Sequence, residues 1–153
     1  MIGTRRAPGE IPGVERVFPP EGTEEVLAAS DFVLLLLPAT GETGGIINRR
    51  TLGAMRPSAW LFNFARGGLI VDADLVEAVT ANTIAGAVLD VFREEPLPPE
   101  HPFWTTGGII VLPHIGGLHP ERDQFVARLF ADNLERFLLG QPLRHVVSRK
   151  RGY

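Results

Sequence analysis

Apolar residues of this chain occur in short runs separated by polar stretches that are rich in glycine and proline. The run Asp31–Leu37 is apolar at both odd and even positions and stops at Pro38, which is typical of a strand buried on both faces of a parallel sheet. Further strands are predicted at Val14–Phe18, Trp60–Phe62, Ile84–Val91 and Ile109–Leu112, and helices at Thr23–Ala29, Asn48–Met55, Asp72–Ala81 and Pro120–Leu139. Because strands alternate with helices, we expect an α/β fold with a parallel sheet built from βαβ units.

Composition narrows the class of protein. The 153 residues suffice for one ordinary domain with a hydrophobic core. A net charge of −3 without a basic stretch argues against nucleic acid or an anionic membrane as a partner. The chain has no cysteine, which excludes disulfides and thiolate metal sites and fits a reducing cytoplasm. The longest apolar run is far too short to span a bilayer. We therefore expect a cytoplasmic protein without a metal ion.

Three residues with chemical potential follow predicted strands. Arg66 lies in Asn63-Phe-Ala-Arg-Gly-Gly68, Glu95 in Asp90-Val-Phe-Arg-Glu-Glu-Pro96, and His114 in Leu112-Pro-His-Ile-Gly116. The carboxyl ends of parallel strands meet at one edge of a sheet, where ligands bind in open α/β folds. A guanidinium can grip a carboxylate with two hydrogen bonds, and an imidazole can exchange a proton near neutral pH. A neighbouring carboxylate can orient that imidazole and favour its charged form.

Each of these residues also has a simpler explanation. Arg66 before two glycines can be a surface turn residue, Glu95 beside Glu94 a solvated loop charge, and His114 a satisfied histidine at a strand end. Exposed arginines such as Arg5 and Arg6 are ordinary near a chain terminus. The combination of all three motifs favours a functional site over these separate explanations.

With these motifs in place, the chain resembles the D-isomer-specific 2-hydroxyacid dehydrogenases. The matching stretches are Leu37–Thr43, Asn63–Gly67, Gly86–Phe92, Glu95–Pro98, His101–Trp104 and Pro113–Gly116. They occur in the family's order and at similar spacing. The run Leu97-Pro-Pro99 and the ending Arg151-Gly-Tyr153 are most similar to the glyoxylate/hydroxypyruvate reductase branch.

The resemblance implies a Rossmann-like, doubly wound parallel sheet with a long C-terminal helix, but one feature departs from it. The family's G-x-G-x-x-G turn after the first strand is absent, and Met1–Arg6 resembles the end of the second strand. We therefore expect a C-terminal piece that lacks the first strand, its glycine turn and the first helix, and that has little activity alone. The expected domains are a partial dinucleotide-binding domain at residues 1–140 and a tail at 141–153. Such a sheet would have an exposed edge in its middle.

The family's mechanism assigns roles to the matching residues. Arg66 would hold the carboxylate of a small 2-keto or 2-hydroxy acid, His114 would act as general acid, and Glu95 would keep the imidazole protonated. Asp90 would bind the nicotinamide carboxamide. The resemblance places five further positions at the cofactor: Leu37, Thr43, Phe64, Ala65 and Gly116. Arg66 and His114 would border the cofactor as well, and Thr43 can equally be a helix-entry residue.

Cofactor preference is read from the end of the second strand. An acidic residue there binds the ribose of NAD, whereas arginine accommodates the 2′-phosphate of NADP. Because Arg5 and Arg6 stand at this place and the first acid is Glu10, NADP(H) is favoured over NAD(H). Family members are commonly dimers, so a homodimer is a candidate assembly. The alternative to an enzyme is a non-catalytic nucleotide-binding module, or a subunit completed by another chain.

Overall fold

The computed structural model describes residues 1–150, which fall into two compact units. The first unit comprises residues 1–114 and the second begins at Ile115. The ending Arg151–Tyr153, which contributed to the resemblance, lies outside the described residues. The predicted domain boundary at residue 140 stays a prediction.

Most predicted elements are confirmed to within a few residues. The strands are β1 (Ile2–Thr4), β2 (Arg16–Phe18), β3 (Phe32–Leu35), β4 (Trp60–Asn63), β5 (Gly86–Leu89) and β6 (Ile109–Val111). The helices are α1 (Thr23–Ala29), α2 (Arg49–Gly53), α3 (Asp72–Thr80) and α4 (Arg122–Leu138). Short 3-10 turns occur at Pro20–Gly22, Gly67–Leu69 and Pro102–Trp104. Helix α2 is shorter than predicted, but Asn48 caps it as expected, because its side chain accepts hydrogen bonds from the Arg50 and Thr51 amides.

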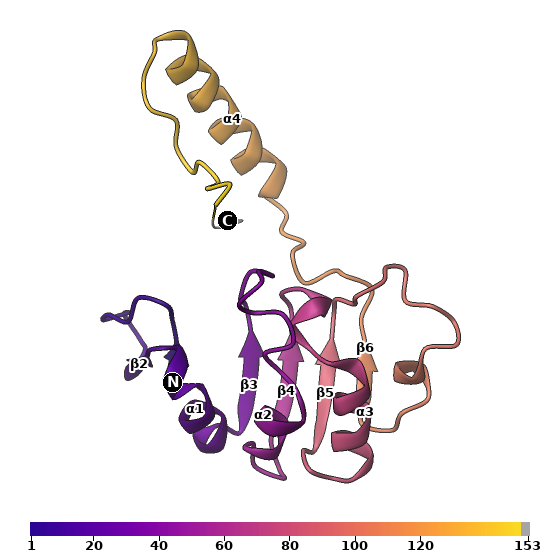
Figure 1. The fold of residues 1–153 in the computed structure, drawn as a ribbon. Coiled ribbons are helices and arrows are strands. Elements are labelled where there is room, and N and C mark those ends of the chain that lie inside the picture. Colours follow the sequence, from indigo (N-terminus) through magenta and orange to yellow (C-terminus); the bar gives the residue numbers. More distant parts are fainter. Residues whose placement is uncertain (151–153) are drawn as a thin grey trace. The chain divides into compact units, whose positions relative to one another are not determined.

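The strands form two parallel sheets (Figure 1). Strand β1 pairs with β2, and a four-stranded sheet has the order β3-β4-β5-β6. In the larger sheet Leu34 aligns with Phe62, Val88 and Ile110 across the four strands. All its strands therefore end at the same edge, as the predicted Rossmann-like fold requires.

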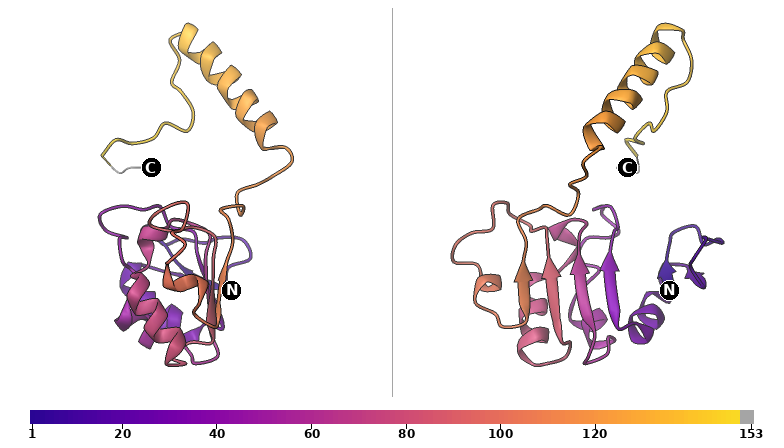
Figure 2. Two further views of the ribbon diagram at one scale, coloured as in Figure 1. Left: turned by 90° about the vertical axis from the view of Figure 1, so that its right-hand side faces the viewer. Right: turned by 180° about the vertical axis from the view of Figure 1, so that it is seen from behind.

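One face of the four-stranded sheet carries the core. Helices α2 and α3 lie on the same side of this sheet (Figure 2). The strand residues buried on this face are Val33, Leu35, Leu61, Ala87 and Leu89, and they belong to one cluster with Leu52 of α2 and Leu75 of α3. Leu27 of α1 joins the same cluster. Helix α1 thereby fixes the chain between the two sheets.

The opposite face, which we call the open face, consists of Phe32, Leu34, Trp60, Phe62, Val88 and Ile110. Phe32 is 71% exposed and Leu34 is 55% exposed. The prediction that Asp31–Leu37 is buried on both faces is therefore wrong for this face. The sequence pattern of β3 is that of a strand covered twice, but in the first unit helices cover it once.

The second unit contains the predicted long helix. Its apolar residues recur at helical spacing, and after α4 the chain turns at Gly140, whose φ of +65° is the left-handed conformation common after a helix. The tail then returns along the helix, since Asn133 Nδ2 donates to the Arg144 carbonyl and Asn133 Oδ1 accepts from the Arg144 amide. Among residues 1–150, none of the helices has the length and hydropathy needed to cross a membrane.

The two faces predict unequal costs for the same substitution. Leu61→Ala empties a site that is 0% exposed and should lower the free energy of unfolding by about 2–5 kcal/mol. Leu34→Ala removes the same atoms from the open face and should cost less than about 1 kcal/mol. Urea denaturation followed by circular dichroism measures both, and equal losses would contradict the assignment of covered and open faces.

Candidate functional site

The candidate site lies at the carboxyl edge of the four-stranded sheet. Arg66 follows β4, Glu95 belongs to the loop after β5, and His114 follows β6. Because β4, β5 and β6 are neighbours and parallel, their C-terminal loops leave the sheet side by side. The topology thus gathers the three residues that the sequence singled out.

Glu95 and His114 are in direct contact. Glu95 Oε2 lies 2.7 Å from His114 Nδ1, while Glu95 Oε1 accepts a hydrogen bond of 2.9 Å from the Phe92 amide. The Glu95 carboxylate therefore connects the backbone of its own loop to the imidazole of His114. Half of the His114 side chain remains exposed, so the ring stays accessible.

The electrostatics of Glu95 agree with this geometry. The pKa of Glu95 is lowered, chiefly by the hydrogen bond from the Phe92 amide and next by the hydrogen bond to His114. Desolvation opposes this lowering, and the charges of His114 and Arg66 add smaller contributions to it. The two hydrogen bonds of the Glu95 carboxylate are therefore the main cause of its lowered pKa.

His114 has an uncommon backbone conformation. Its φ is +56°, in the left-handed region that residues other than glycine rarely adopt. Pro113 precedes it, and the Leu112 amide still pairs with the Leu89 carbonyl at 2.8 Å. The chain therefore turns sharply just after the last ladder contact. Such conformations cluster at functional sites, where surrounding contacts hold them in place.

The turn that carries Arg66 is shaped by a buried amide, which sequence reasoning missed. Asn63 is 0% exposed; its Nδ2 donates to the Arg66 carbonyl and its Oδ1 accepts from the Ala65 amide. Arg66 itself is exposed, and its Nη1 donates to the Ala65 carbonyl. The sequence signal for Asn63 was its position as a polar residue at the end of an apolar strand. Its amide fixes the direction in which Arg66 leaves the sheet.

A second missed feature locks the Arg66 turn against the Glu95 loop. A Cβ atom at Gly67 would stand 2.0 Å from the Phe92 carbonyl carbon, so only glycine allows these two segments to approach this closely. On the same loop Arg93 donates from Nε to the Ile70 carbonyl at 3.1 Å. Arg93 Nε also lies 3.6 Å from Asp72 Oδ1. Burial raises the pKa of Asp72, although the charges of Arg93 and His101 act in the opposite direction.

The remaining predicted positions are distributed around the same edge. Asp90 is 1% exposed and its amide donates to the Asn63 carbonyl. Ala65 is buried, and Phe64 and Leu37 are half-buried. Gly116 belongs to the second unit, so its place relative to the other residues is not described.

Thr43 and the two arginines lie in loops. The Thr43 hydroxyl donates to the Pro38 carbonyl and accepts from the Thr40 amide, so it closes the loop after β3 and enters no helix. Arg5 and Arg6 are exposed at the end of β1, as the sequence suggested. Arg6 forms an ion pair with Glu42 of the loop after β3. This pair ties the end of β1 to the loop after β3.

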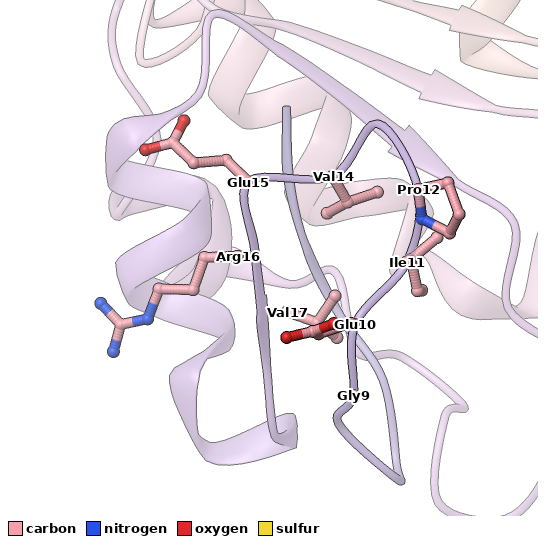
Figure 3. Close-up of a pocket in the computed structure, with 8 residues that line it drawn as sticks. All are labelled: Gly9, Glu10, Ile11, Pro12, Val14, Glu15, Arg16 and Val17. Carbon is pink, nitrogen blue, oxygen red and sulfur yellow. The ribbon is translucent and has the colours of Figure 1, made fainter.

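The hollows of the first unit lie on different elements. One, of about 660 Å³, is lined by Glu95, His114, Leu97 and Trp104 among others, and Trp104 Nε1 donates to the Pro98 carbonyl. Another, of about 600 Å³, lies inside the loop that joins β1 to β2 (Figure 3). It includes none of the predicted site residues, and its Arg16 pairs with Glu25 of α1. The hollow beside His114 therefore belongs to the candidate site, whereas the hollow between β1 and β2 does not.

Comparison with protein families decides the relationship. Residues 3–116 match the family described as D-isomer specific 2-hydroxyacid dehydrogenase, NAD binding domain. The chain belongs to this family. The resemblance inferred from the motifs is thereby confirmed.

Individual relatives agree with the family match. The chain is 36% identical over 148 residues to glyoxylate/hydroxypyruvate reductase A of Photorhabdus laumondii, covering 97% of this chain and 47% of that protein. It is 38% identical over 143 residues to an uncharacterized protein of Corynebacterium melassecola, covering 94% of this chain and 47% of the other. The chain spans about half the length of the curated relatives it matches.

Solved structures share the fold. A D-isomer specific 2-hydroxyacid dehydrogenase of Xanthobacter autotrophicus, in complex with NADPH and MES, is 35% identical with a TM-score of 0.91, covering 99% of this chain and 62% of that one. An NADPH-dependent glyoxylate/hydroxypyruvate reductase of Sinorhizobium meliloti, in complex with NADP and sulfate, is 35% identical with a TM-score of 0.89. The match covers 99% of this chain and 49% of that one. The Rossmann-like fold is thereby confirmed.

The lowered pKa of Glu95 gives a pH prediction. A carboxyl group with a folded-state pKa below its unfolded value stabilises the fold above the unfolded pKa, and this contribution is lost as the pH falls through the folded pKa. An NMR titration should place the Glu95 midpoint below the ordinary value of about 4.3. In His114→Ala the midpoint should rise, yet stay lowered, because the Phe92 hydrogen bond remains. A Glu95 midpoint that is unchanged in His114→Ala would contradict the pairing of Glu95 with His114. His119→Ala is the control and should leave the Glu95 midpoint unchanged.

Proposed function

We propose that the whole protein to which these residues belong is an NAD(P)-dependent 2-hydroxyacid dehydrogenase that reduces a small 2-keto acid of the glyoxylate or hydroxypyruvate type. The observation that carries this proposal is the 2.7 Å contact between Glu95 and His114, at the edge of the sheet where Arg66 also follows its strand. The names of the relatives support the substrate class.

The residues present suit the nicotinamide half of the coenzyme. Asp90 is a buried acid at the end of β5, and Leu37 and Phe64 are half-buried apolar residues at the ends of neighbouring strands. We assign Asp90 to the carboxamide, and Leu37, Phe64 and Ala65 to the pocket of the ring. Thr43 and Gly116 are proposed neighbours of the same region. The sequence has no G-x-G-x-x-G turn, so residues outside these 153 would bind the pyrophosphate.

We assign a different role to each of Arg66, His114 and Glu95. Arg66 would bind the substrate carboxylate through its guanidinium and orient the carbonyl. The coenzyme, when bound, supplies the hydride that reduces the carbonyl carbon. His114 would donate a proton to the developing alkoxide from Nε2, because Nδ1 is held by Glu95. Glu95 would stabilise the imidazolium until the proton is passed on.

Two further assignments belong to this proposal. Arg5 and Arg6 would accommodate the 2′-phosphate of NADP(H), in line with the NADP and NADPH complexes of the structural neighbours, and NAD(H) is the second choice. A homodimer is the proposed assembly, and the cytoplasm the proposed compartment.

A chimera tests the proposed roles. It joins the part of the Photorhabdus laumondii reductase that this chain does not match to the 153-residue chain. We expect NADPH-dependent reduction of glyoxylate, and a loss of about 10²–10⁴-fold in kcat for His114→Ala, since general acid catalysis is removed. Arg66→Ala should lower kcat/KM by a similar order. Arg16→Ala, on β2 away from the site, is the matched control.

The outcomes of this assay are distinct. Wild-type rates for His114→Ala or Arg66→Ala would reject the assigned roles. A chimera that folds and binds NADPH but reduces no 2-keto acid would reject the dehydrogenase proposal. The isolated chain provides the baseline rate.

Cofactor preference gives a separate prediction. Replacing Arg5 and Arg6 together by alanine in the chimera should lower the preference for NADPH over NADH by about 10–100-fold, because charge-assisted hydrogen bonds to a phosphate are lost. Glu42→Gln removes the acid that pairs with Arg6 and should keep or raise this preference. Ratios of kcat/KM for the two coenzymes measure both effects. An unchanged ratio in the double variant would place the 2′-phosphate elsewhere.

A further inference from the structure

An ion cluster outside the candidate site contacts both ends of the loop that carries Glu95. Asp72, in the first turn of α3, has its Oδ1 3.6 Å from Arg93 Nε and its Oδ2 3.6 Å from His101 Nε2. Arg93 comes shortly before Glu95 in the chain, and His101 comes after it. One carboxylate therefore contacts the loop on either side of Glu95. We call Asp72, Arg93 and His101 the Asp72 cluster.

Arg93 anchors the start of this loop. Its guanidinium donates from Nε to the Ile70 carbonyl at 3.1 Å, in the segment that leads into α3. The neighbouring Phe92 amide donates to Glu95 Oε1 at 2.9 Å. The anchor of Arg93 therefore stands directly beside the hydrogen bond that orients the Glu95 carboxylate, and a shift of Arg93 would move that amide.

His101 anchors the end of the loop. Its Nδ1 accepts a hydrogen bond of 3.3 Å from the Phe103 amide, so the neutral ring carries its proton on Nε2, the atom that faces Asp72. The ring also meets the Phe103 ring edge-on, with 4.3 Å between the centroids. Phe103 is buried, and Trp104 beside it lines the hollow next to His114. His101 thus connects Asp72 to the wall of that hollow.

The charge of Asp72 weakens the fold rather than strengthening it. Its side chain is 25% exposed, and burial raises its pKa although the charges of Arg93 and His101 act in the opposite direction. A carboxyl group whose pKa rises on folding destabilises the folded state at every pH above that pKa, where it is ionised. The position of Asp72 is therefore better explained by the loop that it holds than by stability.

We propose that Asp72 is a positioning residue, which holds the loop from Arg93 to His101 so that the Glu95 carboxylate meets the His114 imidazole. The described partners of Asp72 are Arg93 and His101, so Asp72 acts on Glu95 through the loop. Anchoring both ends of a loop restricts the conformations of the residues between them. The effect of Asp72 on the reaction rests on the proposed function, whereas its effect on the Glu95–His114 contact is measured without a substrate.

The tautomer of His114 tests this positioning. While Glu95 accepts from Nδ1, the neutral ring carries its proton on that atom, whereas a ring without this partner distributes the proton over both nitrogens. Nitrogen NMR of the 153-residue chain at about pH 9, above the ordinary pKa of histidine, distinguishes the two forms. We expect the Nδ1–H form of His114 in the wild type and a mixture in Asp72→Asn, because the loop that carries Glu95 is then held less firmly.

Hydrogen exchange at neutral pH provides a second measurement. The Phe92 amide should exchange about 2–10-fold faster in Asp72→Asn, because its hydrogen bond to Glu95 opens more often. The Leu112 amide, which donates to the Leu89 carbonyl, is the internal reference and should keep its rate.

Asp74→Asn is the matched control, because it removes the same charge from the same turn of α3. Asp74 accepts a hydrogen bond from the Arg49 amide of α2, which an asparagine can also accept. The control should keep the Nδ1–H form of His114 and the Phe92 exchange rate. Asp72→Asn should be at least as stable as this control in urea, since it removes a carboxylate that weakens the fold.

The chimera shows the consequence for the reaction. Asp72→Asn should lower its kcat for glyoxylate about 2–10-fold, because His114 is oriented less often. The KM for NADPH should stay unchanged, since the described partners of Asp72 are loop residues.

A mixed His114 tautomer already in the wild type, or an unchanged tautomer in Asp72→Asn, would overturn the proposal. A variant clearly less stable than Asp74→Asn would overturn it too, because the cluster would then serve the fold as a whole. A mixed tautomer in Asp72→Asn together with a chimera that reduces no 2-keto acid would support the positioning and reject the proposed reaction. Should Asp72→Asn fail to fold by circular dichroism, His101→Gln replaces the ring that faces Asp72 by a neutral amide and is read in the same way.

Discussion

The candidate site depends on the parallel pairing of β4, β5 and β6. In an antiparallel arrangement the segments after these strands would alternate between opposite ends of the sheet, and Arg66, Glu95 and His114 would not share an edge. Parallel pairing instead places the loops after these three strands at one end of the sheet. The contact between Glu95 and His114 joins the loop after β5 to the segment after β6. The common location of the three candidate residues is therefore a consequence of strand direction.

Small local contacts then set the geometry that strand direction leaves open. Gly67 lets the Arg66 turn approach the backbone of Phe92, and the Phe92 amide in turn holds Glu95. The buried side-chain amide of Asn63 fixes the Arg66 turn, because its nitrogen donates to the Arg66 carbonyl and its oxygen accepts from the Ala65 amide. A chain of backbone contacts thus connects the guanidinium to the carboxylate without a direct bond between them. Supporting contacts of this kind hold the side chains of a candidate site in a defined geometry.

The sequence predicted most helices and strands and the contact between Glu95 and His114, because apolar periodicity and motifs at strand ends are local signals. Asn48 as a helix cap and Thr23–Ala29 as a helix are examples. The open face was not predicted, because the run around Leu34 records only that a strand is apolar, not which elements cover it. Arg93 was also missed, since its partner is the backbone carbonyl of Ile70, twenty-three residues away. A carbonyl acceptor leaves no trace in side-chain patterns.

The loop after β3 connects the two ends of the proposed coenzyme site. It holds Leu37 and Thr43 of the proposed nicotinamide pocket, and its Glu42 pairs with Arg6 at the proposed adenosine end. Coenzyme that orders this loop at one end would therefore reduce the ordering that the other end requires. The two halves of the coenzyme would then favour each other's binding through one segment of backbone.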